Sequence, residues 1–264
     1  STAADTLAQI ASFQPDLVIA GNLHGADLDP GILGLIAARF PTAFVFHDLW
    51  LLTGRCAYTG GCRKYISGCD ATCTCDQSHP VLAPNLVRPT WETKRAVINT
   101  ALTAGPGGLH FWANSDWVLA QVKEALAAPE SGLAPALAAA AATTPLTIKF
   151  GFELDVFRPR DKARCREELG LPQDRFIIMS SASSLADPRK GLGHLADALA
   201  MLKLPDSMVA GVGWFEKGEQ PPIAGMRAMG YMSEPERLAM LYSAADIFVG
   251  PSLEEAFGQV FIEA

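Results

Sequence analysis

Short runs of apolar residues alternate along the chain with segments in which apolar residues return every three or four positions. The runs are rich in β-branched and aromatic residues, and nearly every position in them is apolar. Such runs are typical of parallel strands that are buried on both faces, because a half-exposed strand would alternate. They predict strands at residues 16–20, 43–46, 109–113, 176–180, 208–212 and 247–249.

Helical spacing is clearest in the second half of the chain. Leucines repeat on one side of segment 192–202, and apolar residues do the same in segment 238–245. The second helix is predicted to start at Ser233, because Ser233 and Glu236 have the spacing of a capping box. Strands that alternate with helices in this way indicate a doubly wound α/β fold.

The length of 264 residues accommodates two domains of ordinary size. We expect two Rossmann-like domains, one at residues 1–148 and one at residues 149–264. The first domain carries a cysteine-rich insertion at about 54–79. An alanine-rich stretch at 129–145 is either a loosely packed helix or a connection.

Charge and hydropathy exclude some classes of function. The formal net charge is −7, and both halves share the acidic excess, which argues against a nucleic-acid partner. No apolar run reaches the roughly 18 to 20 residues that span a bilayer. The first residues also lack the basic start and apolar core of a signal peptide. We therefore expect a soluble protein of the cytoplasm.

The final segment, residues 245–263, holds two carboxylates separated by seven residues, Glu255 and Glu263. On one helix they would lie about 12 Å apart along the axis, too far for a paired acid and base, which need roughly 5 to 9.5 Å. They are better suited to accepting hydrogen bonds from hydroxyls at two places on an extended polyol. Amides near Phe257 and Gly258, at a predicted helix start, suit a phosphate. The alternative is two solvated glutamates beside an ordinary turn.

The same segment contains Pro251-Ser252, Glu255-Ala-Phe-Gly258 and Glu263, preceded by Tyr242-Ser-Ala-Ala-Asp246. In this it resembles the retaining glycosyltransferases of family 4, which have the GT-B fold. The resemblance implies two Rossmann-like domains whose parallel sheets face each other across a cleft. It also implies a nucleoside diphosphate sugar as donor, with Glu255 toward the sugar and Glu263 toward the ribose. No cofactor is required in that family.

A basic pair, Arg189 and Lys190, follows the strand predicted at 176–180. Cations at a strand's carboxyl end can neutralise a diphosphate and stabilise it as it leaves, although a solvated loop would carry the same charges. The family has a Lys-Gly at this helix start, matched by Lys190-Gly191. Its usual arginine stands six residues before the lysine, where this chain has Ser184, so Arg189 is offered as a substitute.

Two further candidates lie at predicted strand ends. Gly213 suits either a close approach to the ligand or a structural turn. His47, followed by Asp48, suits either a hydrogen-bonded structural residue or a site residue. The resemblance places a histidine here against the transferred sugar, so His47 joins Glu255 and Lys190 as a candidate catalytic residue. His24 is a weaker candidate, and we favour a loop role for it.

The insertion holds five cysteines at uneven spacings, of which only Cys69 and Cys73 match a usual zinc-ligand pair. Structural zinc, disulfides and packed thiols remain alternatives for the set Cys56, Cys62, Cys69, Cys73 and Cys75. A His-Asp-Leu-Trp followed by such an insertion resembles an exopolysaccharide or colanic-acid type branch of the family, with the insertion on the acceptor side.

Six cations lie in or near the insertion. We expect a solvated surface, or else a face for an anionic acceptor or for the cytoplasmic side of the inner membrane. They are Arg55, Arg63, Lys64, Arg88, Lys94 and Arg95.

The resemblance leads to an expected function. It is transfer of a hexose from a UDP- or GDP-sugar to a glycan or lipid-linked glycan in polysaccharide biosynthesis. The alternatives are a binding module without turnover, or another GT-B enzyme such as an epimerase. The chain lacks the first strand and Gly-rich loop of the family's first domain and stops one residue after Glu263. We therefore expect a fragment that is incomplete at both ends.

Overall fold

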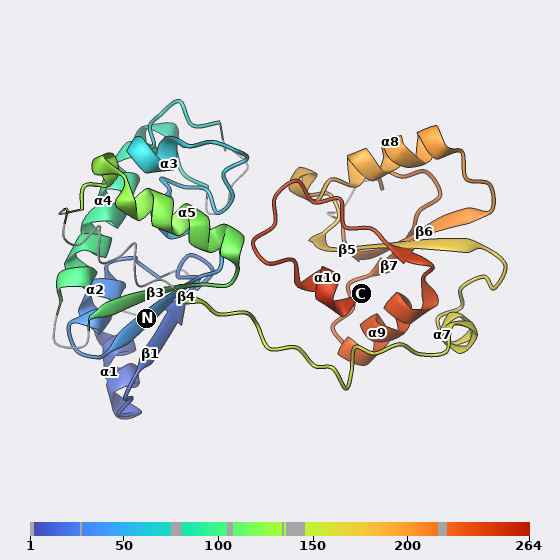
Figure 1. Ribbon diagram of the computed structural model, residues 1–264, viewed down its shortest axis with the longest axis horizontal. Helices are drawn as coiled ribbons and strands as arrows, with labels where there is room; N and C mark the ends of the chain where they lie inside the picture. The colour runs from blue at the N-terminus through green and yellow to red at the C-terminus, as the bar shows by residue number, and fades with distance from the viewer. Residues whose placement is uncertain are drawn as a thin grey trace. The chain divides into compact units, whose positions relative to one another are not determined.

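The structure is a computed structural model, which describes residues 3–26, 28–74, 81–104, 108–133, 135, 146–215 and 221–264. The chain divides into two compact units, Ser1–Phe150 (unit 1) and Gly151–Ala264 (unit 2), each with its own sheet (Figure 1). The division falls two residues after the boundary expected from the sequence.

Unit 1 contains a parallel sheet of order β1-β2-β3-β4. Val18 pairs with Thr42, Thr42 with Leu109, and Trp112 with Leu146. All five residues of β2 are buried, as the continuous apolar run predicts. The strands are β1 (Val18–Gly21), β2 (Thr42–Phe46), β3 (Leu109–Ala113) and β4 (Leu146–Thr147).

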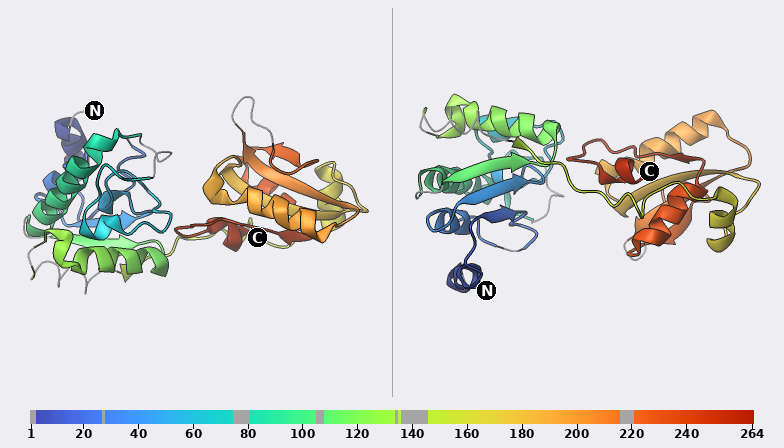
Figure 2. Two further views of the ribbon diagram at one scale, coloured as in Figure 1. Left: turned by 90° about the horizontal axis from the view of Figure 1, so that it is seen from above. Right: turned by 60° about the horizontal axis from the view of Figure 1, so that its bottom comes forward.

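The helices of unit 1 flank this sheet (Figure 2). The start of α5 is fixed by Ser115, whose hydroxyl accepts a hydrogen bond from the amide of Val118, as a helix cap requires. The helices are α1 (Ala3–Ser12), α2 (Ile32–Ala37), η1 (Trp50–Leu52), α3 (Lys64–Ser67), α4 (Pro84–Thr103), α5 (Asp116–Ala127) and η2 (Pro129–Ser131). Of the alanine-rich stretch, residues 134 and 136–145 lie outside the described residues.

Unit 2 contains a second parallel sheet, of order β7-β6-β5-β8. The strands are β5 (Phe176–Ser184), β6 (Ser207–Trp214), β7 (Arg227–Gly230) and β8 (Ile247–Phe248). The helices are α7 (Lys162–Glu168), η3 (Pro188–Lys190), α8 (Leu192–Leu202), α9 (Pro235–Ala244) and α10 (Gln259–Glu263). Figure 2 shows each sheet flanked by helices of its own unit.

Helices cover both faces of the sheet in unit 2. Ile177 and Met179 of β5 pack in one cluster with Leu241 of α9. Between them in sequence, Ile178 packs in the other cluster with Leu192 of α8. Alternate residues of one strand thus enter two cores, which explains why the run is apolar at every position. The expected doubly covered parallel sheet is confirmed.

All six segments predicted as strands contain one, but two features differ from expectation. Strands β4 and β7 were not predicted, because β4 has only two residues and β7, Arg-Ala-Met-Gly, is mostly exposed. The prediction of a capping box at Ser233 is wrong. Pro235 occupies the first position of α9, so the cap position falls on Glu234, whose side chain makes no capping hydrogen bond.

In the described part of the chain, no helix combines the length and the apolar composition needed to cross a membrane.

Candidate functional site

The candidate site of unit 2 lies where the order of its strands reverses. From β5 the chain adds β6 and then β7 on one side, and returns to place β8 on the other side of β5. Helices leave the carboxyl ends of β5 and β8 in opposite directions at such a point, which opens a crevice that binds ligands in open α/β sheets. Both segments selected from the sequence follow these two strands.

A glycine lets the two segments touch. Gly191, between η3 and α8, has a φ of 69°, in the left-handed region. A Cβ at this position would lie 2.1 Å from the carbonyl oxygen of Pro251. The amide of Leu253 donates to the carbonyl of Arg189 at 2.8 Å. Only glycine combines this backbone angle with this approach, so the loop after β8 lies directly on the turn after β5.

This approach pairs the two charged residues. The Nζ of Lys190 lies 2.7 Å from Oε2 of Glu255, and the two side chains are 13% and 23% exposed. The Nη1 of Arg189 donates to the carbonyl of Glu254 at 3.0 Å, and its Nη2 to Oδ2 of Asp187 at 3.1 Å. Arg189 therefore fixes the loop. Lys190 and Glu255 are paired with each other, and a ligand can take the place of either partner.

Glu263 has a separate partner. Its Oε2 accepts a hydrogen bond of 2.9 Å from the hydroxyl of Tyr242 on α9. Burial, and then the nearby Glu263 carboxylate, raise the pKa of Tyr242, so the phenol stays protonated and remains a donor. Glu255 precedes α10 and Glu263 is its last residue, so the two carboxylates do not share a helix.

The remaining candidate residues of unit 2 are Phe257, Gly258 and Gly213, and their contacts within the fold explain most of what is seen at these positions. Gly258 is buried, has a φ of 71° and precedes the five-residue α10; Phe257 beside it is half-buried. At Gly213, a Cβ would lie 2.0 Å from the carbonyl of Ala182 on β5. Close packing between strands therefore explains Gly213 without a ligand.

In unit 1, His47 follows β2 and lies beside the end of β1. A Cβ on Gly21 would lie 2.9 Å from Nε2 of His47, and the imidazole stacks on Phe150 with 5.4 Å between ring centroids. The ring therefore lies at the carboxyl edge of this sheet, where functional residues of such folds gather.

Asp48 joins this edge to His24, in the turn after β1. Its Oδ1 accepts from the amide of Trp50 at 2.8 Å, and its Oδ2 lies 3.5 Å from Nε2 of His24. Burial raises the pKa of Asp48. His24 also stacks on Trp50, with 4.9 Å between ring centroids. His24 lies in the turn after β1, in agreement with the favoured loop role, and the pairing of β1 with β2 brings it to Asp48.

The expectation of a solvated basic surface is wrong for three of the six cations. Arg55, Lys94 and Arg95 are buried. Their side chains donate to backbone carbonyls of neighbouring segments, which offsets the cost of burying these cations. Lys94 is 1% exposed and donates to the carbonyls of Trp50 at 2.8 Å and Thr53 at 3.1 Å. Burial lowers its pKa to about 7.

The other three cations each have an acidic partner. Arg63 pairs with Glu124, Lys64 with Asp70, and Arg88 with Glu92. The six cations therefore do not form one exposed basic surface, and a role for them toward an anionic acceptor or a membrane stays a prediction.

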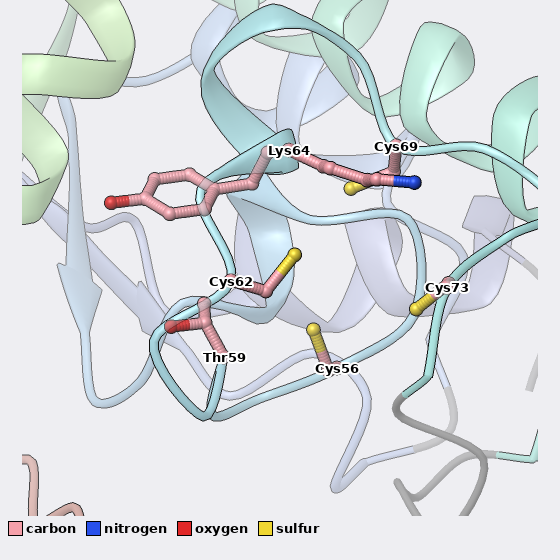
Figure 3. A pocket seen from close by; sticks show the side chains of 7 residues that line it. Cys56, Thr59, Cys62, Lys64, Cys69 and Cys73 are labelled. Carbon is pink, nitrogen blue, oxygen red and sulfur yellow. The ribbon is translucent and has the colours of Figure 1, made fainter.

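Four cysteines line one small cavity in the insertion (Figure 3). Its volume is about 10 Å³, and its lining residues are Cys56, Thr59, Cys62, Lys64, Tyr65, Cys69 and Cys73. Burial raises the pKa of Cys69 to about 11. No disulfide joins two of the described cysteines, and no three described His, Cys, Asp or Glu side chains are arranged to hold a metal ion. Cys75 lies outside the described residues, and zinc stays a prediction.

No protein-family model matches the chain. Among curated proteins, it is 32% identical over 127 residues to the D-inositol 3-phosphate glycosyltransferase of Segniliparus rotundus, covering 43% of this chain and 28% of the relative. It is 34% identical over 134 residues to D-inositol 3-phosphate glycosyltransferase 2 of Catenulispora acidiphila, covering 45% and 31%. The chain thus spans about a third or less of the length of these relatives.

Among solved structures, the chain resembles Anabaena Alr3699/HepE, determined in complex with UDP and glucose. The TM-score is 0.58 at 18% sequence identity, over 99% of this chain and 59% of the other. This likeness shows the fold, which is that of the GT-B class, with two Rossmann-like parallel-sheet units.

Proposed function

We propose that this chain is part of a glycosyltransferase and that unit 2 binds the nucleoside diphosphate sugar donor. The observation that carries the proposal is the convergence of Lys190 and Glu255, 65 residues apart in sequence, at the strand-order reversal. The naming of both curated relatives as glycosyltransferases supports it, as does the fold shared with a protein that was determined with UDP and glucose.

Each residue has a role that its chemistry suits. Lys190 would bind the diphosphate and Glu255 would accept hydrogen bonds from sugar hydroxyls, which extends donor recognition from the phosphates to the sugar. Glu263 would accept from the ribose hydroxyls, held in place by Tyr242. The half-buried Phe257 and the amide of Gly258 would border the donor. Arg189 would order the loop, and Gly213 would keep the strands close.

The reaction breaks the bond between the anomeric carbon and the β-phosphate oxygen and forms a bond from that carbon to an acceptor oxygen. The nucleoside diphosphate leaves with the bonding electrons, and its departing phosphate oxygen takes the proton that the acceptor hydroxyl gives up. Lys190 would stabilise the charge that develops on this leaving group. The sequence resemblance assigns contact with the transferred sugar to His47.

The finer parts of the proposal follow from the sequence resemblance. They are retention of anomeric configuration, a hexose from a UDP- or GDP-sugar, and a glycan or lipid-linked acceptor in polysaccharide biosynthesis in the cytoplasm. The cysteine cavity suits the same branch of the family. No cofactor takes part in this scheme, and elemental analysis that finds one zinc per chain would establish a structural ion.

Calorimetry with UDP, GDP and ADP tests donor binding, and Lys190→Met should weaken the preferred nucleotide at least about tenfold. Asp197→Asn, an exposed change on α8, is the matched control. Binding of all three nucleotides equally weakly, or not at all, would contradict the proposal. Binding without sugar transfer to any glycan would instead favour a module that holds nucleotide without turnover.

A further inference from the structure

The two side chains that the proposed function assigns to the donor neutralise each other in this structure. The Lys190 ammonium and the Glu255 carboxylate are 2.7 Å apart, and both are largely shielded from solvent. Arg189 adds a second positive charge, with its Nη1 3.9 Å from the same Oε2. A nucleotide therefore meets an ammonium that already has a carboxylate partner.

We propose that this ion pair makes the site select nucleotide sugar over bare nucleoside diphosphate, the product of the reaction. The inference rests on the proposed function. A diphosphate that takes Lys190 leaves the half-buried Glu255 carboxylate next to phosphate charge, with only the more distant Arg189 as a cation, which is unfavourable. The hydroxyls of a bound sugar donate to that carboxylate and offset the loss, whereas bare diphosphate offers none.

Arg189 relieves the carboxylate only in part, because its Nη1 stays 3.9 Å from Oε2 of Glu255. Its Nη1 is bound to the carbonyl of Glu254 and its Nη2 to Asp187, and the first of these bonds holds the loop that carries Glu255. Moving Arg189 to Glu255 would cost those bonds. The replacement partner must therefore come from the ligand, and the sugar is the part of the donor that product lacks. The pair thereby favours release of product after transfer.

Glu255→Gln removes the pair while keeping the shape of the side chain. We expect the affinity for UDP to rise about 3- to 10-fold, because Lys190 is no longer engaged. The affinity for UDP-glucose should not rise in parallel, because an amide accepts hydroxyl bonds less well than a carboxylate. The ratio of the UDP dissociation constant to the UDP-glucose dissociation constant should therefore fall at least about threefold. If GDP binds more tightly than UDP, the same comparison is made with GDP and GDP-mannose.

A double-mutant cycle separates the pair from simple repulsion between Glu255 and phosphate. In a Lys190→Met background there is no pair to break, so Glu255→Gln should change UDP affinity less than about twofold. An equal gain in both backgrounds would mean repulsion alone and would overturn the inference. So would a loss of UDP affinity on Glu255→Gln.

These outcomes are distinct from failure of the proposed function. A chain that binds none of UDP, GDP and ADP contradicts the proposed function itself. A chain that binds nucleotide but keeps the same preference for nucleotide sugar after Glu255→Gln contradicts only the role of the pair. Asp197→Asn, which removes one exposed carboxylate from the same unit, should leave both affinities unchanged.

Discussion

The cations of unit 1 and those of unit 2 were selected from the same kind of sequence signal, but the fold uses them differently. Lys94 and Arg95 are buried, and their side chains donate to backbone carbonyls. Lys190 is partly exposed at a strand-order reversal and has the Glu255 carboxylate as its partner, whereas Arg189 is held by the carbonyl of Glu254 and by Asp187. A carbonyl belongs to the chain and cannot be exchanged, whereas a carboxylate partner can be replaced by a phosphate. Partner type and burial thus separate a structural cation from a binding one.

Gly191→Ala should have the largest effect, because it breaks the turn that places the cations of unit 2. The new Cβ would meet the carbonyl of Pro251 at 2.1 Å, and the φ of 69° is strained for alanine. We expect the free energy of unfolding of unit 2 to fall by about 3 kcal/mol, with loss of nucleotide binding.

The matched control lies two residues further on, in α8. Gly193 has open space around its Cβ position, so Gly193→Ala should stabilise unit 2 by about 0.5 to 1 kcal/mol. Urea denaturation followed by hydrogen exchange, which resolves peptides of each unit, measures both changes. Equal effects of the two substitutions would refute the close approach.

Lys94→Met should come next and affect unit 1. The carbonyls of Trp50 and Thr53 would lose a buried donor, while the cost of burying an amine would also disappear. We expect a net loss of about 2 kcal/mol in the free energy of unfolding, read from tryptophan fluorescence, with unchanged nucleotide affinity. Lys149→Met, at an exposed position of the same unit, should change stability by less than about 0.5 kcal/mol.

The sequence was informative where periodicity and spacing are local. Alternate burial of Ile177 and Ile178 in two cores follows from a run that is apolar at every position. The convergence of Lys190 and Glu255 was foreseeable only in part. Each motif marked a strand end, but the pairing depends on β8 returning beside β5, which no local pattern records.

Two contacts that the sequence did not predict have the same origin. Burial of Lys94 depends on carbonyls that lie 44 and 41 residues earlier in the chain. His24 reaches Asp48 only because β1 and β2 are neighbours. The predicted cap at Ser233 is wrong for a local reason. The proline at position 235 has a fixed φ that suits the first position of a helix, so α9 starts there.

The pH dependence of unit 1 sharpens the contrast with unit 2. The Lys94 pKa is about 7 in the folded chain, against an ordinary 10.5. Between these values the unfolded chain holds a proton that the folded chain lacks, so stability rises with pH. We expect the free energy of unfolding to increase by about 1.5 kcal/mol between pH 7 and 8.5.

Denaturation at several pH values measures this rise, and Lys94→Met should remove most of it. The titratable groups facing Lys94 are Asp48, Cys56 and Cys69. The pKa of Cys69 is raised to about 11, which acts in the opposite sense at higher pH, so the range ends at 8.5. An unchanged slope in the variant would show that another group causes it.

The smallest effect should come from Tyr242→Phe, which tests whether a carboxylate of unit 2 is held for a ligand. The substitution removes only the hydroxyl that donates to Glu263 at 2.9 Å. Freed from it, Glu263 samples more rotamers, and nucleotide affinity should fall about fivefold, the equivalent of one hydrogen bond. Tyr231→Phe, at an exposed tyrosine of the same unit, should leave affinity unchanged.

The two glutamates then give opposite results, which neither a general charge effect nor unfolding would produce. Losing the partner of Glu263 weakens nucleotide binding, because Tyr242 presents that carboxylate to the ribose. Losing the charge of Glu255 strengthens binding of bare nucleotide, because Lys190 is released. If Tyr242→Phe instead leaves affinity intact while Glu263→Ala reduces it, the ribose assignment stands and the tyrosine serves packing alone.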